Sequence, residues 1–349
     1  MKNTISKIGM LSAALLVSAA GLSSCSKDDD NTPDVPRPSK EAISFNVTVP
    51  KAARGVTTTS SINDFSVWAF TGNELFMNNV KVNREGSVWN YSPTMFWPAD
   101  NAEVNFYCVS PTIPGNVLTA TPTPDIPGFI NNTGSVDLLY AVNMKQTAGE
   151  TGQVKVNFRH ALSQVRFLLS RKSDPSVNPI RVEINKVELV NIASKGDFQM
   201  PRATTSAVTT DRGEWTNLGN IHNVTLYDGK SKTLTDTPTE YNTPGYIFSI
   251  PQELLASVRQ GNSFNGAWLS VRCSIYDDVS GVRLWPSTTD LGYENGFALL
   301  YFPLNADDSR YPEWEPGKAY SYGISIGVPQ GSSAIDFDVT VDEYGDFLQ

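Results

Sequence analysis

Histidine and cysteine, two side chains that often catalyse reactions or bind metals, are rare in this chain. The sequence holds 2 histidines, His160 and His222, which stand apart in different regions. Zinc sites are usually marked by spacings such as C-x-x-C or H-E-x-x-H, and phosphate sites by glycine-rich loops before a helix. None of these patterns occurs here. The sequence therefore predicts no catalytic residue, no metal, no cofactor and a protein that is not an enzyme.

The remaining candidates for chemistry have plainer explanations. His160 lies between Phe158 and Leu162, which favours a packed side chain whose nitrogens bond to backbone; a catalytic histidine is the alternative. The acid pairs at 277–278 and 307–308 fall in polar turns next to predicted strands. Solvated carboxylates are the default there, with calcium binding or carboxylate catalysis as alternatives.

Two cysteines lie within alternating apolar segments. Cys108 in EVNFYCVS and Cys273 in WLSVRCSIY each fall on the apolar face of a predicted strand. Such a position predicts a buried thiol, and the two lie in different predicted domains. A disulfide between them, formed in an oxidising compartment, is the alternative.

The elements that would position these residues are strands. Charged residues make up 18%, aromatic residues 10%, and there are 25 Gly and 22 Pro, a composition typical of short strands and many turns. Only 251–261, PQELLASVRQG, has a helical pattern. Apolar residues alternate with polar ones at 43–49, 65–70, 103–109, 154–158, 164–169, 181–190, 246–250, 268–275, 320–326 and 335–341. This pattern predicts an all-β protein built of antiparallel sandwiches.

The N-terminus carries an export signal. Lys2 and Lys7 precede an apolar run over 8–22, the length of a signal peptide. The following LSSC resembles a bacterial lipobox, which makes residues 1–24 a lipoprotein signal peptide and Cys25 the lipidated first residue of the mature chain. A chance cysteine after an ordinary signal peptide is the alternative.

An acidic and proline-rich tether is predicted next, over residues 25–40. SKDDD at its start resembles the surface-export signal of Bacteroidetes lipoproteins, and NTPDVPRPSK should be extended and unpacked. The remainder is too long for one sandwich core. We expect an N-terminal β-sandwich domain at 41–159 and a C-terminal one at 160–349. The net charge of −9, without a basic cluster after the signal, argues against nucleic acid as a partner.

The two ends of the mature chain share a strand pattern. ISFNVTV begins at residue 43 and IDFDVTV at residue 335, so the same apolar types recur at the same spacing. Side chains on alternate residues point to one face, and burying four of this kind contributes about 6–12 kcal/mol. Either strand would then fit one groove. The two inward-facing sets are Ile43, Phe45, Val47 and Val49, and Ile335, Phe337, Val339 and Val341.

A polar loop follows the first copy of this pattern. The segment 51–61, KAARGVTTTSS, carries Arg54 and Gly55 near its centre. Exposed polar loops are preferred sites of proteolysis. A cut between Arg54 and Gly55 by an arginine-specific protease would release the first strand, whereas a simple solvated arginine and a chance strand similarity are the alternatives.

Several longer segments resemble the fimbrillins, the subunits of type V pili in Bacteroidales. The resemblance rests on INDFSVWAF, on YSPTMFWPADNAEVNFYCVSP at 91–111, on VNFRHALSQVRFLL and on WEPGKAYSYGISI at 314–326. It implies two transthyretin-like sandwich domains, lipoprotein export, proteolytic removal of the first strand and its replacement by the next subunit's C-terminal strand. By position it makes Cys25 the lipid site, Arg54 the cleavage site and 335–341 the donor strand.

This resemblance implies a structural fimbrial subunit of the shaft or anchor type, because the last strand is present and a tip adhesin would not need to donate one. Its partners would be other fimbrial subunits, joined by strand exchange, and the outer membrane, reached through the lipid. Its location would be the cell surface, within a fimbrium; the host or microbial ligand is left open. The alternative is a non-polymerising surface lipoprotein that binds glycans through exposed members of its 7 Trp and 13 Tyr.

Overall fold

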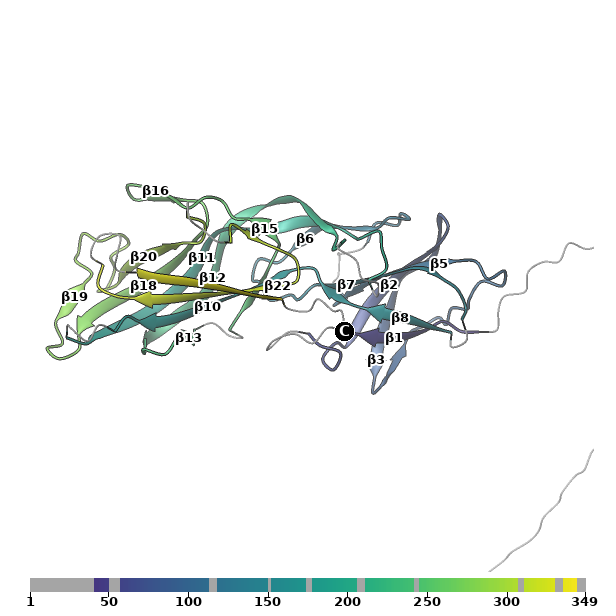
Figure 1. The fold of residues 1–349 in the computed structure, drawn as a ribbon, viewed down its shortest axis with the longest axis horizontal. Coiled ribbons are helices and arrows are strands. Elements are labelled where there is room, and N and C mark those ends of the chain that lie inside the picture. The colour runs from purple at the N-terminus through teal and green to yellow at the C-terminus, as the bar shows by residue number, and fades with distance from the viewer. Residues whose placement is uncertain are drawn as a thin grey trace, which may run out of the picture. The chain divides into compact units, whose positions relative to one another are not determined.

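A computed structural model describes residues 41–49, 57–112, 118–149, 152–173, 178–205, 211–241, 245–306 and 311–329, and the backbone of 335–343. All regular structure in these ranges is β-strand, which confirms the predicted all-β class (Figure 1). Cys25, the tether, Arg54 with Gly55, and the acid pair at 307–308 lie outside the described residues.

The first part of the chain builds an antiparallel sheet of six strands in the order β4-β3-β2-β5-β7-β9. A separate parallel pair, β1 (Ser44–Thr48) and β8 (Gln153–Asn157), shares its hydrophobic core. The six strands are β2 (Asp64–Thr71), β3 (Glu74–Glu85), β4 (Val88–Asn90), β5 (Val104–Ser110), β7 (Leu139–Gln146) and β9 (Arg159–His160).

A second six-stranded sheet is antiparallel and follows the order β12-β11-β18-β19, with β20 also paired to β18 and β6 to β11. Although β6 precedes residue 160 in the chain, its hydrogen bonds go to β11. The strands are β6 (Asp125–Ile130), β11 (Ile180–Gln199), β12 (Glu214–Thr233), β18 (Trp268–Asp277), β19 (Arg283–Trp285) and β20 (Ala298–Pro303).

A third sheet has the order β13-β10-β22-β23, with β14 paired to β10. Side chains of β10, β11, β18 and β22 form one buried cluster between this sheet and the previous one, as the alternation in their sequences predicts. The strands are β10 (Ser163–Arg171), β13 (Thr239–Glu240), β14 (Ile247–Ser249), β22 (Lys318–Ile326) and β23 (Ile335–Glu343). Two short pairs complete the described strands: β15 (Gln252–Glu253) with β21 (Glu313–Trp314), and β16 (Val258–Gln260) with β17 (Ser263–Asn265).

A further buried cluster joins residues on both sides of position 160. Trp68 and Tyr107 belong to it together with Phe198 and Phe248. The aromatic rings of Tyr140 and Phe198 have centroids 5.0 Å apart. Elements on the two sides of residue 160 therefore share apolar packing, while the two sandwich domains and their division at residues 159 and 160 stay a prediction.

The helix predicted over 251–261 is wrong. The segment instead contributes β15 and β16, joined by irregular backbone. Gln252 is buried, and its side-chain amide bonds to the Ala193 backbone, accepting from N–H at 2.9 Å and donating to the carbonyl at 3.1 Å. The Leu254 N–H donates to the Pro312 carbonyl at 2.8 Å. The polar groups of this segment thus find partners in distant parts of the chain, so tertiary contacts override the local pattern.

Candidate strand-binding groove

The first strand is seated by its alternating apolar side chains. Ile43, Phe45, Val47 and Val49 are each at most 6% exposed, whereas Asn46 and Thr48 between them face solvent. The four apolar side chains all join the core beneath the six-stranded sheet. Because successive side chains of a strand point to opposite faces, this burial follows directly from the sequence pattern.

Phe45 occupies the centre of an aromatic cluster. Its ring centroid lies 5.6 Å from that of Phe65, 5.5 Å from that of Tyr91 and 6.2 Å from that of Phe106, all edge to face. Such pairs add to the stabilisation that burial alone provides. The three surrounding rings come from β2, β5 and the loop after β4, so they form a socket for one large side chain.

Backbone bonds hold β1 along both of its edges, but unequally. On one side it pairs in parallel with β8, where Phe45 lies opposite Val154 and Val47 opposite Val156. On the other side the Ile43 N–H donates to the Met95 carbonyl at 2.9 Å, and the Tyr91 hydroxyl donates to the Ile43 carbonyl at 2.8 Å. A full ladder therefore holds one edge, while contacts near the strand's start hold the other.

The chain is fixed again soon after β1 ends. The Thr59 hydroxyl bonds to the backbone of Val49. Arg84 donates from Nη1 to the carbonyls of Thr59, at 2.8 Å, and Ser60, at 2.9 Å. Val49 is thereby tied to Thr59, and Thr59 in turn to Arg84 on β3.

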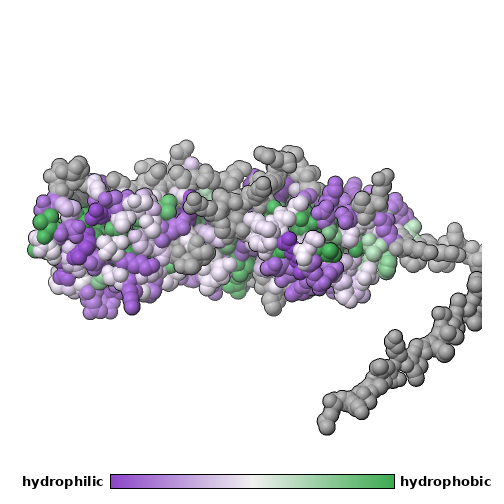
Figure 2. All heavy atoms as spheres, turned by 90° about the horizontal axis from the view of Figure 1, so that it is seen from below, coloured by the Kyte–Doolittle hydropathy of each residue, from purple (hydrophilic) through white to green (hydrophobic). Residues whose placement is uncertain are grey.

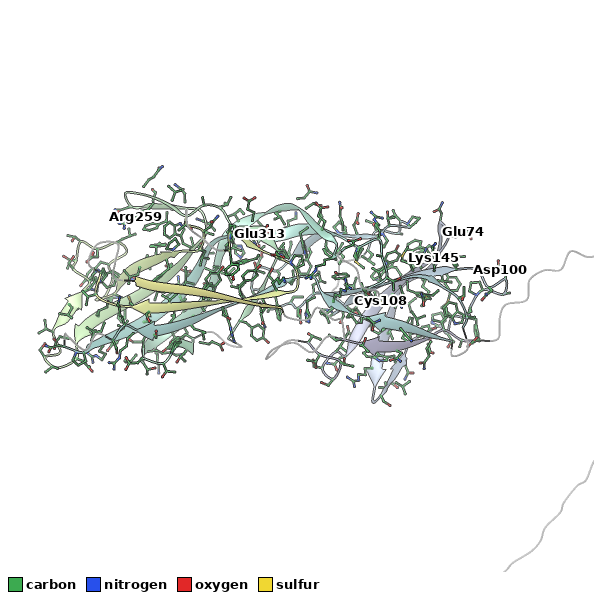
Figure 3. All side chains as sticks on the ribbon, in the orientation of Figure 1. Glu74, Asp100, Cys108, Lys145, Arg259 and Glu313 are labelled. Carbon is green, nitrogen blue, oxygen red and sulfur yellow. The ribbon has the colours of Figure 1, made fainter. Side chains whose placement is uncertain are left out.

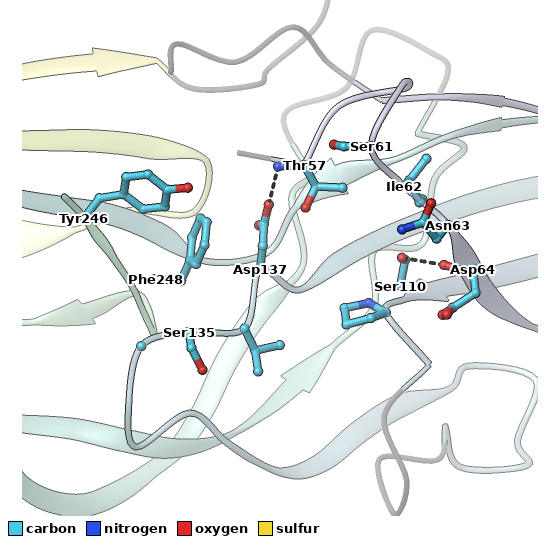
Figure 4. A pocket seen from close by; sticks show the side chains of 13 residues that line it. Thr57, Ser61, Ile62, Asn63, Asp64, Ser110, Ser135, Asp137, Tyr246 and Phe248 are labelled. Atoms are coloured by element: carbon cyan, nitrogen blue, oxygen red, sulfur yellow. Dashed lines mark hydrogen bonds between the residues drawn. The ribbon is translucent and has the colours of Figure 1, made fainter. Parts of the chain in front are cut away.

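Thr57 is held by a buried carboxylate. Its N–H donates to Asp137 Oδ2 at 3.1 Å (Figure 4). Asp137 Oδ1 lies 2.8 Å from His160 Nδ1. His160 is 2% exposed, which confirms the predicted packed histidine. Its Nδ1 partner, however, is a carboxylate and not the backbone group we expected. Burial raises the pKa of Tyr246, and the nearby carboxylate of Asp137 raises it further.

A cleft of about 470 Å³ opens beside this pair, as Figure 4 shows. Asp64 and Asp137 line it together with hydroxyl groups of Ser61 and Ser110. Both carboxylates already have partners: Asp64 accepts the Thr112 N–H at 2.8 Å and lies 3.9 Å from Lys81 Nζ. The polar groups of the cleft thus serve to fix loops.

The C-terminal strand lies at the end of its sheet. β23 pairs antiparallel with β22 over nine residue pairs, from Lys318 opposite Glu343 to Ile326 opposite Ile335. In the described strand order it has a neighbour on one side only. This backbone arrangement contains the predicted donor residues Ile335, Phe337, Val339 and Val341.

The acid pair at 277–278 shapes a turn. Asp277 accepts bonds from the Val279 N–H at 3.0 Å, the Ser280 N–H at 2.7 Å and the Asn178 side chain at 3.0 Å. These bonds, led by the one from the Ser280 N–H, lower the pKa of Asp277 to about 2. Across the described ranges, His, Cys, Asp and Glu side chains form no group of three that could hold a metal ion.

Cys108, labelled in Figure 3, is a buried free thiol. Cys273 is a buried free thiol in a different core cluster, so the alternative of a disulfide is wrong. Burial raises the pKa of both thiols. Four large aromatic side chains are also buried, namely Trp68, Trp97, Trp268 and Tyr320. They are therefore not positioned to stack on a sugar.

Sequence reasoning missed the residues that hold the loop. Nothing in TTTSS distinguishes Thr59 from its neighbours, and Asp137 is far from His160 in the chain. Tyr91, whose hydroxyl bonds to the Ile43 carbonyl at the start of β1, was also missed. Its segment, 91–111, had been used only for the family resemblance.

Comparison with known proteins gives one family. Residues 51–343 match the family described as fimbrillin-like, so this chain belongs to that family. Its members are structural fimbrial and adhesion proteins, not enzymes. Among curated proteins no match is found. Within the part of the chain that the structure describes, no helix is long and apolar enough to cross a membrane.

Solved structures share the fold at low identity. A fimbrial protein from Bacteroides vulgatus is 15% identical, with a TM-score of 0.58 over 86% of this chain and 99% of that one. A fimbrilin from Porphyromonas gingivalis is 11% identical, with a TM-score of 0.51 over 88% and 98%. A protein from Bacteroides uniformis that is described as a cell adhesion protein is 12% identical, with a TM-score of 0.51 over 87% of this chain and 99% of that one.

Proposed function

We propose that this protein is a fimbrial subunit that joins its neighbours by strand exchange. In this proposal a cut between Arg54 and Gly55 frees β1, and the C-terminal strand of another subunit takes its place. Ile335, Phe337, Val339 and Val341 of the donor would fill the positions of Ile43, Phe45, Val47 and Val49. The partner is thus a copy of this chain or a related subunit.

The seating of β1 carries the proposal. Four alternating side chains bury into one core, and the same apolar types recur at the same spacing in β23. Burial of such a set is worth about 6–12 kcal/mol before the cost of ordering the strand. An emptied groove would therefore bind a matching strand strongly. The position of β23 at the end of its sheet supports the proposal, since a strand with one neighbour loses fewer bonds on leaving.

Polymerisation of protein that lacks residues 1–54 tests this function. We expect it to form multimers and to take up a synthetic IDFDVTV peptide. Phe337→Asp should abolish multimers because a charge would enter the aromatic socket, while Thr340→Asp, at the other parity of the strand, serves as the matched control. Unchanged assembly of Phe337→Asp would refute the donor assignment.

We further propose export as an outer-membrane lipoprotein through signal peptide 1–24, lipidation at Cys25 and the tether 25–40. The LSSC motif and the family support this proposal. Palmitate labelling of wild type and of Cys25→Ala tests it, because label should be lost only in the variant. N-terminal sequencing of protein from the cell surface then separates roles: a start at Gly55 indicates a polymerised shaft subunit, and a retained Cys25 an anchor.

A further inference from the structure

The hairpin that joins β18 to β19 exposes several apolar side chains, although a hairpin in contact with water alone is normally polar. Val279 is 73% exposed, Val282 59% and Leu284 46%. Figure 2 shows apolar surface at the left edge of the view, where Figure 1 places β19. Apolar side chains gathered on one exposed feature mark interaction sites more often than scattered ones do.

We propose that this apolar hairpin, residues 279–284, is the contact surface for a neighbouring subunit, which it meets at Phe96. The inference rests on the proposed strand exchange and adds to it the second surface of the joint. The neighbouring subunit is a second copy of this chain. The two surfaces differ, so the contact is of the head-to-tail kind that forms chains of subunits.

The hairpin lies at the root of the C-terminal strand. β22 ends at Ile326, whose carbonyl accepts the Lys172 N–H at 2.8 Å. The adjacent Arg171 pairs with Ile326 and places Nη1 3.9 Å from Asp278 Oδ2. Val279 follows Asp278 directly in the chain. The point where the chain leaves β22 towards β23 is therefore next to the apolar hairpin.

Chain length keeps the hairpin near any subunit that receives β23. Residues 327–334 connect the two strands and span at most about 28 Å when fully extended. A donated strand would start at Ile335, immediately after this connection. Whichever groove takes the strand, its near end must lie within that reach of the hairpin.

The match between the two strand patterns determines which end of the groove lies near the hairpin. Ile335 corresponds to Ile43, so the donated strand would enter at the Ile43 end. There Ala42 is bridged to Phe96, an aromatic side chain that is 46% exposed. An apolar hairpin and an exposed aromatic ring would thus face each other across the joint.

One charged group of the hairpin has possible partners near Phe96. Arg283 is exposed within the hairpin. Asp100 and Glu103, both exposed, follow Phe96 in the loop that leads to β5 (Figure 3 labels Asp100). Arg283 would pair with these acidic groups across the joint, whereas Asp277 and Asp278 at the base of the hairpin are already held by Asn178, Ser280, Arg171 and Arg181.

Cysteine cross-linking in the assembled polymer tests the contact. Chains lacking residues 1–54 would carry Val282→Cys with Phe96→Cys, or Val282→Cys with Val88→Cys as the matched control, because Val88 is also exposed, at 57%, on β4. The native thiols Cys108 and Cys273 are buried and do not compete. A short bis-maleimide should give a covalent ladder with the first pair and not with the second.

Polymer that forms normally but yields no ladder with the first pair, or equal ladders with both, would overturn the contact while leaving strand exchange intact. Absence of any polymer in the unmodified chain would instead refute the proposed function and this inference with it. A second variant separates the hairpin contact from strand exchange. Val282→Asp should slow assembly at least about tenfold yet leave uptake of the IDFDVTV peptide unchanged, since the peptide carries no hairpin. Equal loss of both would indicate a folding defect and contradict the proposal.

Discussion

The Thr59 hydroxyl binds both backbone groups of Val49, accepting its N–H at 2.8 Å and donating to its carbonyl at 2.9 Å. Thr59 thereby replaces a missing ladder partner at the last residue of the seated segment. The covalent path between the two residues runs through Arg54 and Gly55. A cut there would leave β1 held by hydrogen bonds and packing alone, so release would be a separate step from cleavage.

Removal of this hydroxyl should speed that release. Thr59→Val keeps the shape but loses two hydrogen bonds, which lowers the free energy of strand dissociation by about 1–3 kcal/mol. After treatment with an arginine-specific protease, the rate of fragment loss measured by native mass spectrometry should rise. Thr59→Ser keeps the hydroxyl and should behave as wild type. Equal rates for Val and Ser would show that Thr59 does not retain the strand.

The aromatic socket makes Phe45 the most sensitive residue of β1. Phe45→Ala should lower the free energy of unfolding by about 3–5 kcal/mol, because it leaves a cavity among Phe65, Tyr91 and Phe106. Urea denaturation measures the change. Asn46→Ala alters the exposed face of the same strand and should stay within about 0.5 kcal/mol of wild type. A similar loss in both variants would contradict the described seating.

Asp137 should matter for stability although it is not catalytic. Asp137→Ala removes the acceptor of the Thr57 N–H and the partner of His160, at a cost of about 1–3 kcal/mol in unfolding free energy. Faster amide exchange at Thr57 should accompany the loss. Ser135→Ala, an exposed change in the same loop, is the control. Unchanged exchange at Thr57 would argue against the bond.

The turn at Asp277 predicts a defined pH dependence. Its folded pKa, about 2, lies below the ordinary value of 3.8, so its contribution to stability is present above about pH 4 and is lost as the pH falls towards 2. Asp277→Asn should remove this contribution, so the variant should be less stable than wild type above about pH 4, and the difference between the two should shrink as the pH falls towards 2. NMR titration of the carboxyl carbon checks the pKa directly, and a value near 4 would refute the turn bonds.

Both buried thiols should be unreactive in the native protein. Because burial disfavours the thiolate, Cys108 and Cys273 should not react with a thiol reagent at pH 8 until the chain is unfolded. Colorimetric thiol counting with and without denaturant measures this. Rapid labelling of either thiol in the native state would contradict its buried position.

Much of the fold could be predicted from alternation alone. Strands that pack one face on a core, such as β1, β5 and β18, show it clearly in Phe45, Phe106 and Val271. β12 escaped prediction because it is exposed along most of its length and has no face that must be apolar. β3 was missed for the same reason. The false helix at 251–261 arose because Gln252 bonds to a distant strand, which no local pattern reveals.

The candidate site divides in the same way. Its apolar half was predictable, since Ile43, Phe45, Val47 and Val49 follow one period. Its polar half was not, because Thr59, Asp137 and Arg84 act through a few hydrogen bonds to other segments of the chain. Pairing of that kind depends on the assembled sheet and leaves no periodic trace in the chain.

The parallel pairing of β1 with β8 has a mechanical consequence for a fibre. A strand pulled along its own axis in this slot strains every rung of the ladder at the same moment, whereas a strand peeled sideways would lose them in turn. If a donated strand takes the same slot, tension along the fibre acts in the lengthwise direction. The joint would then resist flow far better than its hydrogen-bond count suggests, because rupture has to overcome the whole ladder in one event.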